Sequence, residues 1–290
     1  MAKIEIADKT GALRMCIDVE NAEPEMIGRE RNVLWHGDPA YWGKHDPILF
    51  PTIGNSWEQR IVVEGKTYPM PKHGFGQRLP WHLASGGYGS SATLELCNSE
   101  ESGKHYPFPF AVRQRFDITD EKTVKVTWEV ESSLNLPFMM GAHPAFELPD
   151  FNPDDEVHGY LQFDTADIVS NSVLPDGFLH PEQTTIALEE GNILPLKNDT
   201  FACDTLLDIR GMNKKVTLLD KNRKPIVAVT HDMPVLALWS PKHGCCPFVC
   251  IEPWCGICDV PGYNGEFAER QHIQHTNGKM WTTAYTIEVL

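Results

Sequence analysis

The sequence predicts an all-β protein folded as a sandwich or a barrel, and three observations support this fold class. Apolar and polar residues alternate along several short segments, as expected for strands with one buried face. Clusters of Gly, Pro, Asn and Asp separate these segments. No segment combines helix caps with three turns of apolar periodicity, which disfavours a βαβ architecture.

The alternation is clearest in residues 123–130, where apolar side chains from Val124 to Val130 are separated by polar ones. This pattern is typical of a half-buried strand. Further strands are predicted at residues 111–118, 215–219, 225–230, 235–239 and 285–289. Turns are predicted at residues 8–11, 86–89, 176–177 and 222–225.

The length fits one large β domain. All-β proteins of 200 residues or more often form a single domain, and the chain has 290 residues. No internal repeat, low-complexity tract or linker divides it, so we expect one domain over residues 1–290. The 8 Trp, 13 Phe and 7 Tyr residues supply enough apolar bulk for a large core.

The charge balance bears on the kind of partner. The formal net charge is −15, from 40 acidic and 25 basic residues. Nucleic acids and anionic membranes are bound through clustered Lys and Arg, so we expect neither as a partner. A neutral small molecule fits this balance better.

The N-terminus and the cysteines indicate a cytoplasmic protein with reduced thiols. Acidic residues interrupt the first apolar stretch, so no signal peptide is expected, and no stretch is long enough to span a membrane. Five of the 8 cysteines lie between Cys245 and Cys258. Cys255 and Cys258 have the spacing of a zinc knuckle, and Cys245, Cys246 or Cys250 could complete a site. The remaining spacing is unusual for zinc, so we expect no metal.

Long irregular stretches are predicted at residues 35–55 and 253–276, which are rich in Trp, Tyr, His, Gly and Pro. Binding sites in β proteins are often built from such loops. His36 and His45 in the first stretch are possible ligand contacts, and Trp35, Tyr41 and Trp42 are possible stacking surfaces.

Glu252 is the strongest candidate for a general base. Residues 247–251 predict a buried strand, and Pro253 should end it, because proline cannot continue a central ladder. A carboxylate beside Trp254 and other apolar neighbours would be desolvated, and its pKa would rise towards that of a useful base. The alternative is a strand-end glutamate in an ordinary ion pair.

His143 and His73 are candidates for proton transfer and hydrogen bonding. His143 precedes Pro144, which favours an extended backbone and fixes the direction of the imidazole. His73 precedes Gly74, which permits close approach of a ligand or of another backbone segment. The alternatives are a core histidine bonded to backbone for His143 and a plain turn for His73. Nucleotide loops, serine nucleophile elbows and helical zinc motifs are absent from the sequence, so we expect no cofactor.

These residues lie in motifs that resemble the aldose 1-epimerase, or galactose mutarotase-like, superfamily, and most closely its LacX-like branch. The resemblance extends over nearly the full length and is carried, in family order, by residues 32–43, 47–54, 68–75, 141–146 and 250–254. It implies a large antiparallel β-sandwich with a sugar site on a concave face.

The resemblance also implies roles for individual residues. Glu252 would take the proton of the anomeric hydroxyl, His143 would protonate the ring oxygen, and His73 would hold the sugar. Arg60 matches a family arginine approximately, and Asp204 matches a sugar-binding aspartate by position. The alternatives are a strand-edge charge for Arg60 and a turn residue for Asp204. Trp35 and Trp254 are expected to contact the sugar.

The function favoured by the sequence is therefore an aldose 1-epimerase that acts on a free aldose without a cofactor. A hexose-6-phosphate 1-epimerase would need clustered cations, for which Arg60, Arg113 and Arg115 are the visible candidates. A carbohydrate-binding protein without activity would not need an acid and a base. A glycoside hydrolase would typically need two opposed carboxylates, and only Glu252 stands out.

Overall fold

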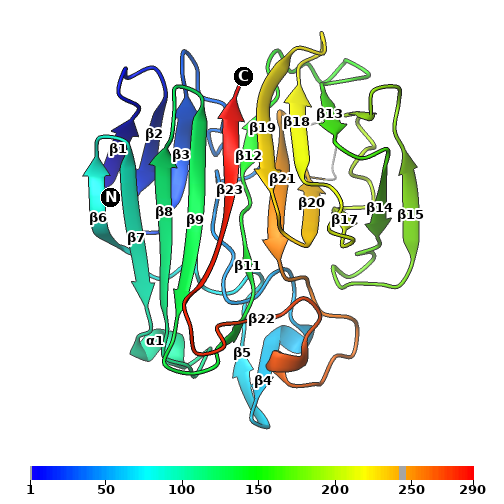
Figure 1. Cartoon of the computed structure of the whole chain (residues 1–290). Helices are drawn as coiled ribbons and strands as arrows, with labels where there is room; N and C mark the ends of the chain where they lie inside the picture. Colours follow the sequence, from blue (N-terminus) through cyan, green and yellow to red (C-terminus); the bar gives the residue numbers. More distant parts are fainter. Residues whose placement is uncertain (1, 242–245) are drawn as a thin grey trace.

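The computed structural model describes residues 2–241 and 246–290, and it is built almost entirely from antiparallel strands (Figure 1). This confirms the all-β prediction. The one α-helix among the described residues is the single turn α1 (Glu100–Gly103), and its 3-10 helices are η1 (Trp57–Gln59) and η2 (Phe267–Glu269). None of the helices in these ranges is long and apolar enough to cross a bilayer.

The largest sheet, called the large sheet here, forms the front layer in Figure 1. Its strands, from one edge to the other, are β16 (Ile193–Pro195), β13 (Tyr160–Phe163), β18 (Lys215–Leu219), β19 (Pro225–His231), β23 (Trp281–Val289), β9 (Thr123–Glu131), β8 (Ala111–Ile118), β7 (Ser91–Cys97) and β6 (His82–Tyr88).

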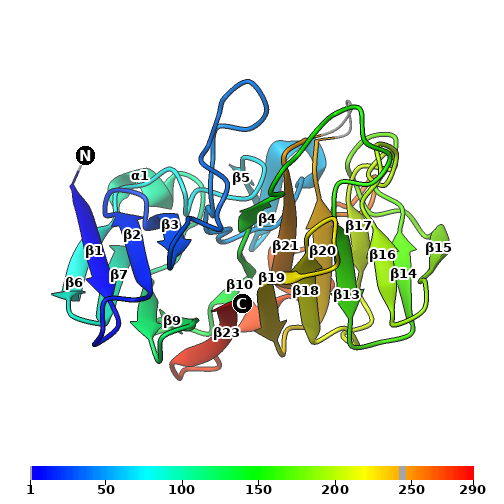
Figure 2. The ribbon, with the colours of Figure 1, turned by 90° about the horizontal axis from the view of Figure 1, so that it is seen from above.

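Two further sheets lie behind the large sheet (Figures 1 and 2). The N-terminal sheet, behind β6–β9, contains β1 (Lys3–Ala7), β2 (Arg14–Asp18) and β3 (Glu23–Gly28). The second sheet, behind the other half, runs in the order β11 (Met140–Gly141), β21 (Phe248–Cys255), β20 (Val235–Trp239), β17 (Leu206–Asp208), β14 (Asp167–Asn171) and β15 (Gln183–Ala187), with β12 (Ala145–Glu147) also paired to β21.

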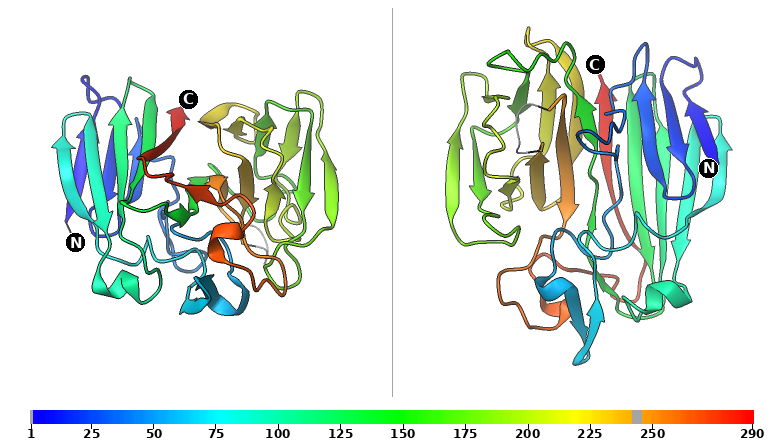
Figure 3. Two further views of the ribbon diagram at one scale, coloured as in Figure 1. Left: turned by 60° about the horizontal axis from the view of Figure 1, so that its bottom comes forward. Right: turned by 180° about the vertical axis from the view of Figure 1, so that it is seen from behind.

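Short strand pairs and loops gather at one end of this sandwich, which comes forward in the left view of Figure 3. They are β4 (Arg60–Val63) with β5 (Lys66–Pro69), and β10 (Pro137–Phe138) with β22 (Gln274–His275). The loop after β21 lies beside the β4–β5 hairpin in both views of Figure 3. Segments distant in sequence are therefore neighbours at this end.

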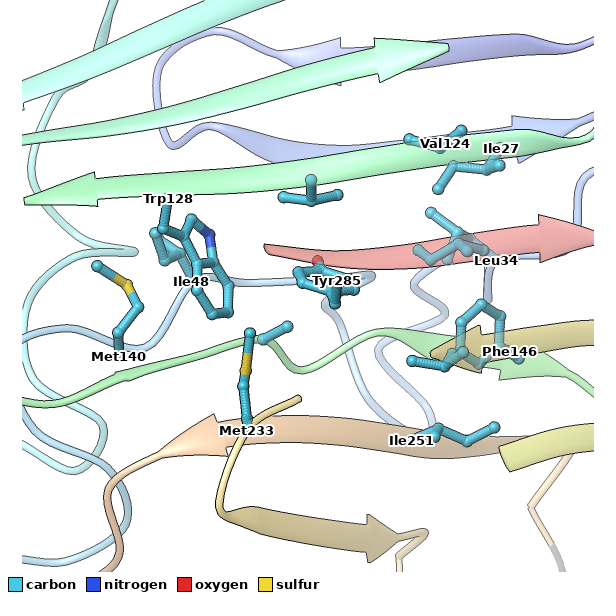
Figure 4. Close-up of a cluster of buried hydrophobic side chains, with 14 of the residues drawn as sticks. Ile27, Leu34, Ile48, Val124, Trp128, Met140, Phe146, Met233, Ile251 and Tyr285 are labelled. Carbon is cyan, nitrogen blue, oxygen red and sulfur yellow. The ribbon is translucent and has the colours of Figure 1, made fainter. Parts of the chain in front are cut away.

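The core lies between the layers. Trp128 of β9 and Tyr285 of β23 share a buried cluster with Met140 of β11 and Ile251 of β21 (Figure 4). Each of these side chains is at most 2 % exposed. Removing such side chains from water is the main driving force for joining the sheets.

The predicted strands agree closely with the structure. Residues 123–130 fall in β9, and its side chains alternate between buried and exposed from Val124 to Val130. The strands predicted at 111–118, 215–219 and 235–239 match β8, β18 and β20 at both ends. Those at 225–230 and 285–289 lie within β19 and β23, which extend further.

One strand prediction is wrong. Glu252 was expected at a strand end, but β21 continues through Pro253 to Cys255. The Pro253 carbonyl accepts a hydrogen bond from the Ala142 N–H at 3.2 Å. The nitrogen and the carbonyl of one residue point to the same side of an antiparallel strand, so the Pro253 nitrogen also faces the segment that contains Ala142. This segment is the interruption between strands β11 and β12, so the ladder does not need an N–H donor at residue 253.

Candidate active site

A cavity of about 290 Å³ opens beside β17, β20 and β21 and collects most of the predicted site residues. Glu252 and Trp254 of β21 line it, as do His73 and His143 from two separate loops. The volume is close to the lower limit for small-molecule sites. Residues far apart in the chain therefore meet at one concavity.

His143 lies in the interruption between β11 and β12, directly across from Glu252. The register pairs Gly141 with Trp254 and Ala145 with Cys250, so the same register sets residue 143 opposite residue 252. Side chains at opposed positions of antiparallel strands point to the same face. The His143 Nε2 and Glu252 Oε2 atoms are 3.3 Å apart.

Burial controls the charge of this pair. Glu252 is 1 % exposed and His143 is 8 % exposed. Desolvation raises the pKa of Glu252 well above its usual value, and it lowers the pKa of His143 to about 3. Burial therefore favours a neutral carboxylic acid beside a neutral imidazole. Within the described residues, Glu252 Oε2 and His143 Nδ1 lack hydrogen-bond partners.

The His73 ring is fixed by reciprocal hydrogen bonds with Gly54. The backbone N–H of His73 donates to the Gly54 carbonyl at 2.9 Å, and the backbone N–H of Gly54 donates to the ring atom His73 Nδ1 at 3.1 Å. Because Nδ1 accepts, the hydrogen of the neutral ring is on Nε2. Burial also lowers the pKa of His73 well below its usual value. The ring lies against His143, with centroids 5.7 Å apart, and offers the cavity a donor.

The backbone around His73 is constrained. His73 itself has a φ of +62°, which is uncommon outside glycine. At Gly54, a Cβ atom would lie 2.5 Å from the Cβ of Cys258. Only glycine fits there, and its close contact with Cys258 sets the position of the N–H that binds His73.

Asp46 holds the backbone of His143 in place and was not predicted from the sequence. It is 2 % exposed and accepts hydrogen bonds from the His143 N–H at 3.2 Å and the Tyr285 hydroxyl at 3.4 Å. Burial raises the pKa of Asp46 to about 7. An acidic residue just before the apolar run 47–50 was the available signal.

The predicted sugar-binding residues divide into two groups. Asp204 and Trp254 line the cavity, and the Trp254 indole N–H donates to the Ala142 carbonyl at 3.0 Å. Arg60 does not line it and instead bonds to Glu58 and Asn264, each at 2.8 Å. Trp35 is 1 % exposed and packs in the core, where its N–H donates to the Trp42 carbonyl at 2.7 Å.

Of the other aromatic candidates, Trp42 lines the cavity and stacks on His143 at 4.8 Å between ring centroids. Tyr41, His36 and His45 are not part of its wall. His36 pairs with Glu147 at 2.8 Å, and His45 faces Glu23 at 3.3 Å. The structure adds wall residues that the sequence did not reveal: Lys44, Lys72, Gln77, Arg78, Trp239 and Cys258.

The cysteine cluster does not converge among the described residues, and Cys245 lies outside them. Cys255 packs in the main core, Cys258 in a second apolar cluster, and Cys246 with Cys250 in a third. The Cys250 sulfur does come within 4.8 Å of ligand atoms of His143 and Glu252. Burial raises the pKa of the Cys250 thiol well above its usual value, which disfavours the thiolate that zinc requires.

The site can therefore exchange protons with a small polar ligand. It offers a carboxyl group and an imidazole 3.3 Å apart, a fixed donor on His73, and indole surfaces of Trp42, Trp239 and Trp254. Such an arrangement suits general acid–base chemistry on a ring with several hydroxyl groups.

Comparisons with known proteins identify the family and the fold. A family model described as "Aldose 1-epimerase" matches residues 22–286. Protein LacX (chromosomal) of Lactococcus lactis subsp. lactis is 28% identical over 235 residues, which cover 77% of this chain and 78% of LacX. A protein of Escherichia coli (strain K12) named "Putative glucose-6-phosphate 1-epimerase" is 25% identical over 212 residues, covering 71% and 65% of the two chains. The X-ray structure of a galactose mutarotase related enzyme from Lactobacillus acidophilus superposes with a TM-score of 0.90 at 25% identity, covering 100% of this chain and 97% of that one.

Proposed function

Because the chain belongs to the aldose 1-epimerase family, we propose that it interconverts the α and β anomers of an aldose whose anomeric hydroxyl is free. The observation that carries the proposal is the opposed pair of His143 and Glu252, 3.3 Å apart in the wall of the cavity. Mutarotation needs one group to remove a proton and another to deliver one, and no redox or group-transfer step.

The pair can start the reaction without changing its net charge. Transfer of the carboxyl proton from Glu252 to His143 gives a carboxylate and an imidazolium. The carboxylate then accepts the proton of the anomeric hydroxyl, while His143 donates its proton to the ring oxygen as the ring C–O bond breaks. The open aldehyde rotates about the adjacent C–C bond, and closure by the reverse proton transfers gives the other anomer.

The other wall residues would hold the sugar in a reactive position. The Nε2–H of His73 can donate to a sugar oxygen near the reacting centre, because its Nδ1 is already occupied by Gly54. Trp42 stacks on His143 and restricts the rotation of the imidazole. Asp204, which also lines the cavity, would bind sugar hydroxyls through its carboxylate.

The test is anomer exchange, measured by two-dimensional exchange NMR on glucose and galactose. We expect Glu252→Gln and His143→Ala each to reduce the catalysed rate by about 10²- to 10⁴-fold, the usual contribution of a general acid or base. Glu147→Gln is the matched control, because this carboxyl group lies on the neighbouring strand β12 and pairs with His36 outside the cavity. Its rate should equal that of the wild type.

Two outcomes would contradict the proposal. Full activity in the Glu252→Gln protein would remove Glu252 as the base. Absence of exchange on every aldose, with sugar binding still measurable, would favour a carbohydrate-binding protein. A second candidate, a hexose-6-phosphate 1-epimerase, shares the same test with glucose 6-phosphate as substrate. The cations Lys72 and Arg78 in the cavity wall favour it.

A further inference from the structure

Asp46 lies where the segment between strands β11 and β12 is attached to a second neighbour. Residues 45–49 run antiparallel to residues 141–145. Leu49 and Gly141 exchange two backbone hydrogen bonds, of 2.8 and 3.1 Å, at one end of this contact. The pairing at that end fixes which residues should face each other along the rest of it.

This register leaves the backbone N–H of His143 without its usual acceptor. The Ala145 N–H donates to the His45 carbonyl at 2.9 Å, which keeps the register, so residue 143 lies opposite Pro47. In a regular antiparallel ladder those two residues would be a hydrogen-bonded pair. Instead, the His143 N–H donates to the carboxylate oxygen Oδ1 of Asp46 at 3.2 Å. A charged side chain therefore replaces the backbone acceptor at the residue that carries the candidate acid.

The second carboxylate oxygen of Asp46 is bound from the opposite layer of the sandwich. The hydroxyl of Tyr285, on β23 of the large sheet, donates to Oδ2 at 3.4 Å (Figure 4). Asp46 and Tyr285 are each 2 % exposed, so this contact is shielded from water. Each carboxylate oxygen thus has one donor, and the two bonds hold the charge of Asp46 next to His143.

Several buried groups determine the charge of Asp46 itself. Burial is the main cause of its raised pKa, and the negative charge of Glu23 adds to the rise. The His143 N–H, the Tyr285 hydroxyl and the positive charge of His45 each oppose it. With a pKa of about 7, Asp46 is a carboxylate on the alkaline side of neutrality.

The charge of Asp46 also reaches Glu252 on the cavity side. Burial is the main cause of the raised pKa of Glu252, Lys72 opposes the rise, and Asp46 adds to it. Asp204 contributes in the same direction as Asp46. The pKa of the Cys250 thiol is raised by burial first, and then by Glu252 and Asp46. An ionised Asp46 therefore favours the form of Glu252 that keeps its proton.

We propose that Asp46 is a positioning residue of the acid–base pair, whose carboxylate sets the place of His143 and whose charge helps Glu252 to keep the proton that starts the reaction. The inference rests on the proposed 1-epimerase function and adds a residue that does not line the cavity. Because the proposed reaction begins with a proton on Glu252, a buried negative charge behind the pair extends the active pH range on its alkaline side.

The experiment is the pH dependence of kcat/KM for anomer exchange of glucose and galactose in the wild type and in Asp46→Asn. Asparagine keeps an oxygen that can accept the His143 N–H but carries no charge, so Glu252 should lose its proton at a lower pH. We expect the alkaline limb of the profile to move down by about one pH unit, the usual coupling between neighbouring buried groups. The rate at the optimum should stay within about threefold of the wild type, because the hydrogen bond is kept.

Two further variants separate the hydrogen bond from the charge. Asp46→Ala removes the acceptor as well, so kcat at the optimum should fall by a further three- to tenfold or so, with little change in KM, the usual effect of losing one hydrogen bond. Tyr285→Phe removes the donor to Oδ2 and favours a neutral Asp46. It should give a smaller shift of the alkaline limb in the same direction, and it provides the test if Asp46→Asn does not fold.

Two control variants remove equally buried polar groups elsewhere. Asp208 is also 2 % exposed and pairs with Arg210, and the fully buried hydroxyl of Tyr106 donates to the Pro137 carbonyl. Neither Asp208 nor Tyr106 lines the cavity. Asp208→Asn and Tyr106→Phe should therefore lower the stability of the protein and leave the pH profile unchanged.

Infrared titration of the Glu252 carboxyl group, identified by the difference from Glu252→Gln, gives a second measurement that needs no turnover. It should show the same downward shift in Asp46→Asn. Superimposable profiles and titrations in the wild type and Asp46→Asn would overturn the role of Asp46 and leave the epimerase proposal standing. An equal shift in Asp208→Asn would also overturn it. A shifted titration in Asp46→Asn, with no exchange on any sugar, would support the role of Asp46 and contradict the epimerase.

Discussion

The substitution Asp259→Asn removes one charge from a buried ion pair that fastens the loop after β21. Asp259 is 5 % exposed and Arg270 is 6 % exposed, and the shortest distance between the Arg270 guanidinium and the Asp259 carboxylate is 2.7 Å. The same carboxylate accepts the Trp57 N–H at 2.7 Å. Asparagine has nearly the same shape, so the change isolates the charge from any effect of a cavity.

The size of the effect follows from leaving Arg270 buried without a counter-charge. Breaking a buried pair in this way costs about 3–5 kcal/mol. At roughly 2.1 cal/mol/K per residue, a chain of 290 residues has an unfolding entropy of roughly 0.6 kcal/mol/K, so Tm should fall by about 5–8 °C.

Differential scanning calorimetry at pH 7 measures this change, with Asp117→Asn as the control. Asp117 pairs with Arg115, whose side chain is 53% exposed, and a surface pair of this kind is worth about 1 kcal/mol or less. If Tm decreases by the same amount in both variants, the buried ion pair does not hold the loop in place. Adding Arg270→Met to Asp259→Asn should recover part of the loss, because it removes the uncompensated charge.

Three further changes test the site. In Asp46→Asn, the free energy of unfolding in urea should fall less than in the wild type as pH rises from about 4.5 to about 7.5. The folded pKa of Asp46 is raised from 3.8 to about 7, so the native state binds the extra proton and loses that stability as pH rises through the window. His73→Asn should lower kcat/KM by about 10- to 100-fold with an unchanged circular dichroism spectrum, because asparagine tolerates the left-handed backbone but lacks the Nε2–H donor. Gly54→Ala should lower the free energy of unfolding by about 1–3 kcal/mol in urea titrations, more than Gly65→Ala, which meets no atom within 4 Å.

The strands were predictable because their signal is local. In β8 and β9 one face is buried against the core and the other faces water, so the alternation appears directly in the sequence. The end of β21 was not predictable by the same rule. Pro253 is tolerated in the middle of a sheet only because a distant segment, residues 142–144, interrupts the neighbouring strand.

The site was partly predictable for a similar reason. Glu252, His143 and His73 each stand in a distinctive local motif, and the structure brings the three to one cavity. Lys72, Arg78 and Asp46 were not predicted, since their proximity to the pair depends on how loops fold over the second sheet. Trp35 and Trp42 are close in sequence, yet one packs in the core and the other lines the cavity, which depends on the direction of a single loop.

The interruption opposite Glu252 has a consequence for how the acid–base pair is protected. Pro253 lies opposite Ala142 and Pro144 lies opposite Ile251, on either side of the His143–Glu252 pair, and neither proline has an N–H with which to return the bonds from Ala142 to Pro253 and from Ile251 to Pro144. Strands β11 and β12 therefore cannot close into one continuous ladder over this stretch. Each proline thus leaves one facing carbonyl, that of Ala142 or that of Ile251, without a backbone donor, and the Ala142 carbonyl accepts the Trp254 indole N–H instead, which ties a wall residue of the cavity to the interruption that carries His143.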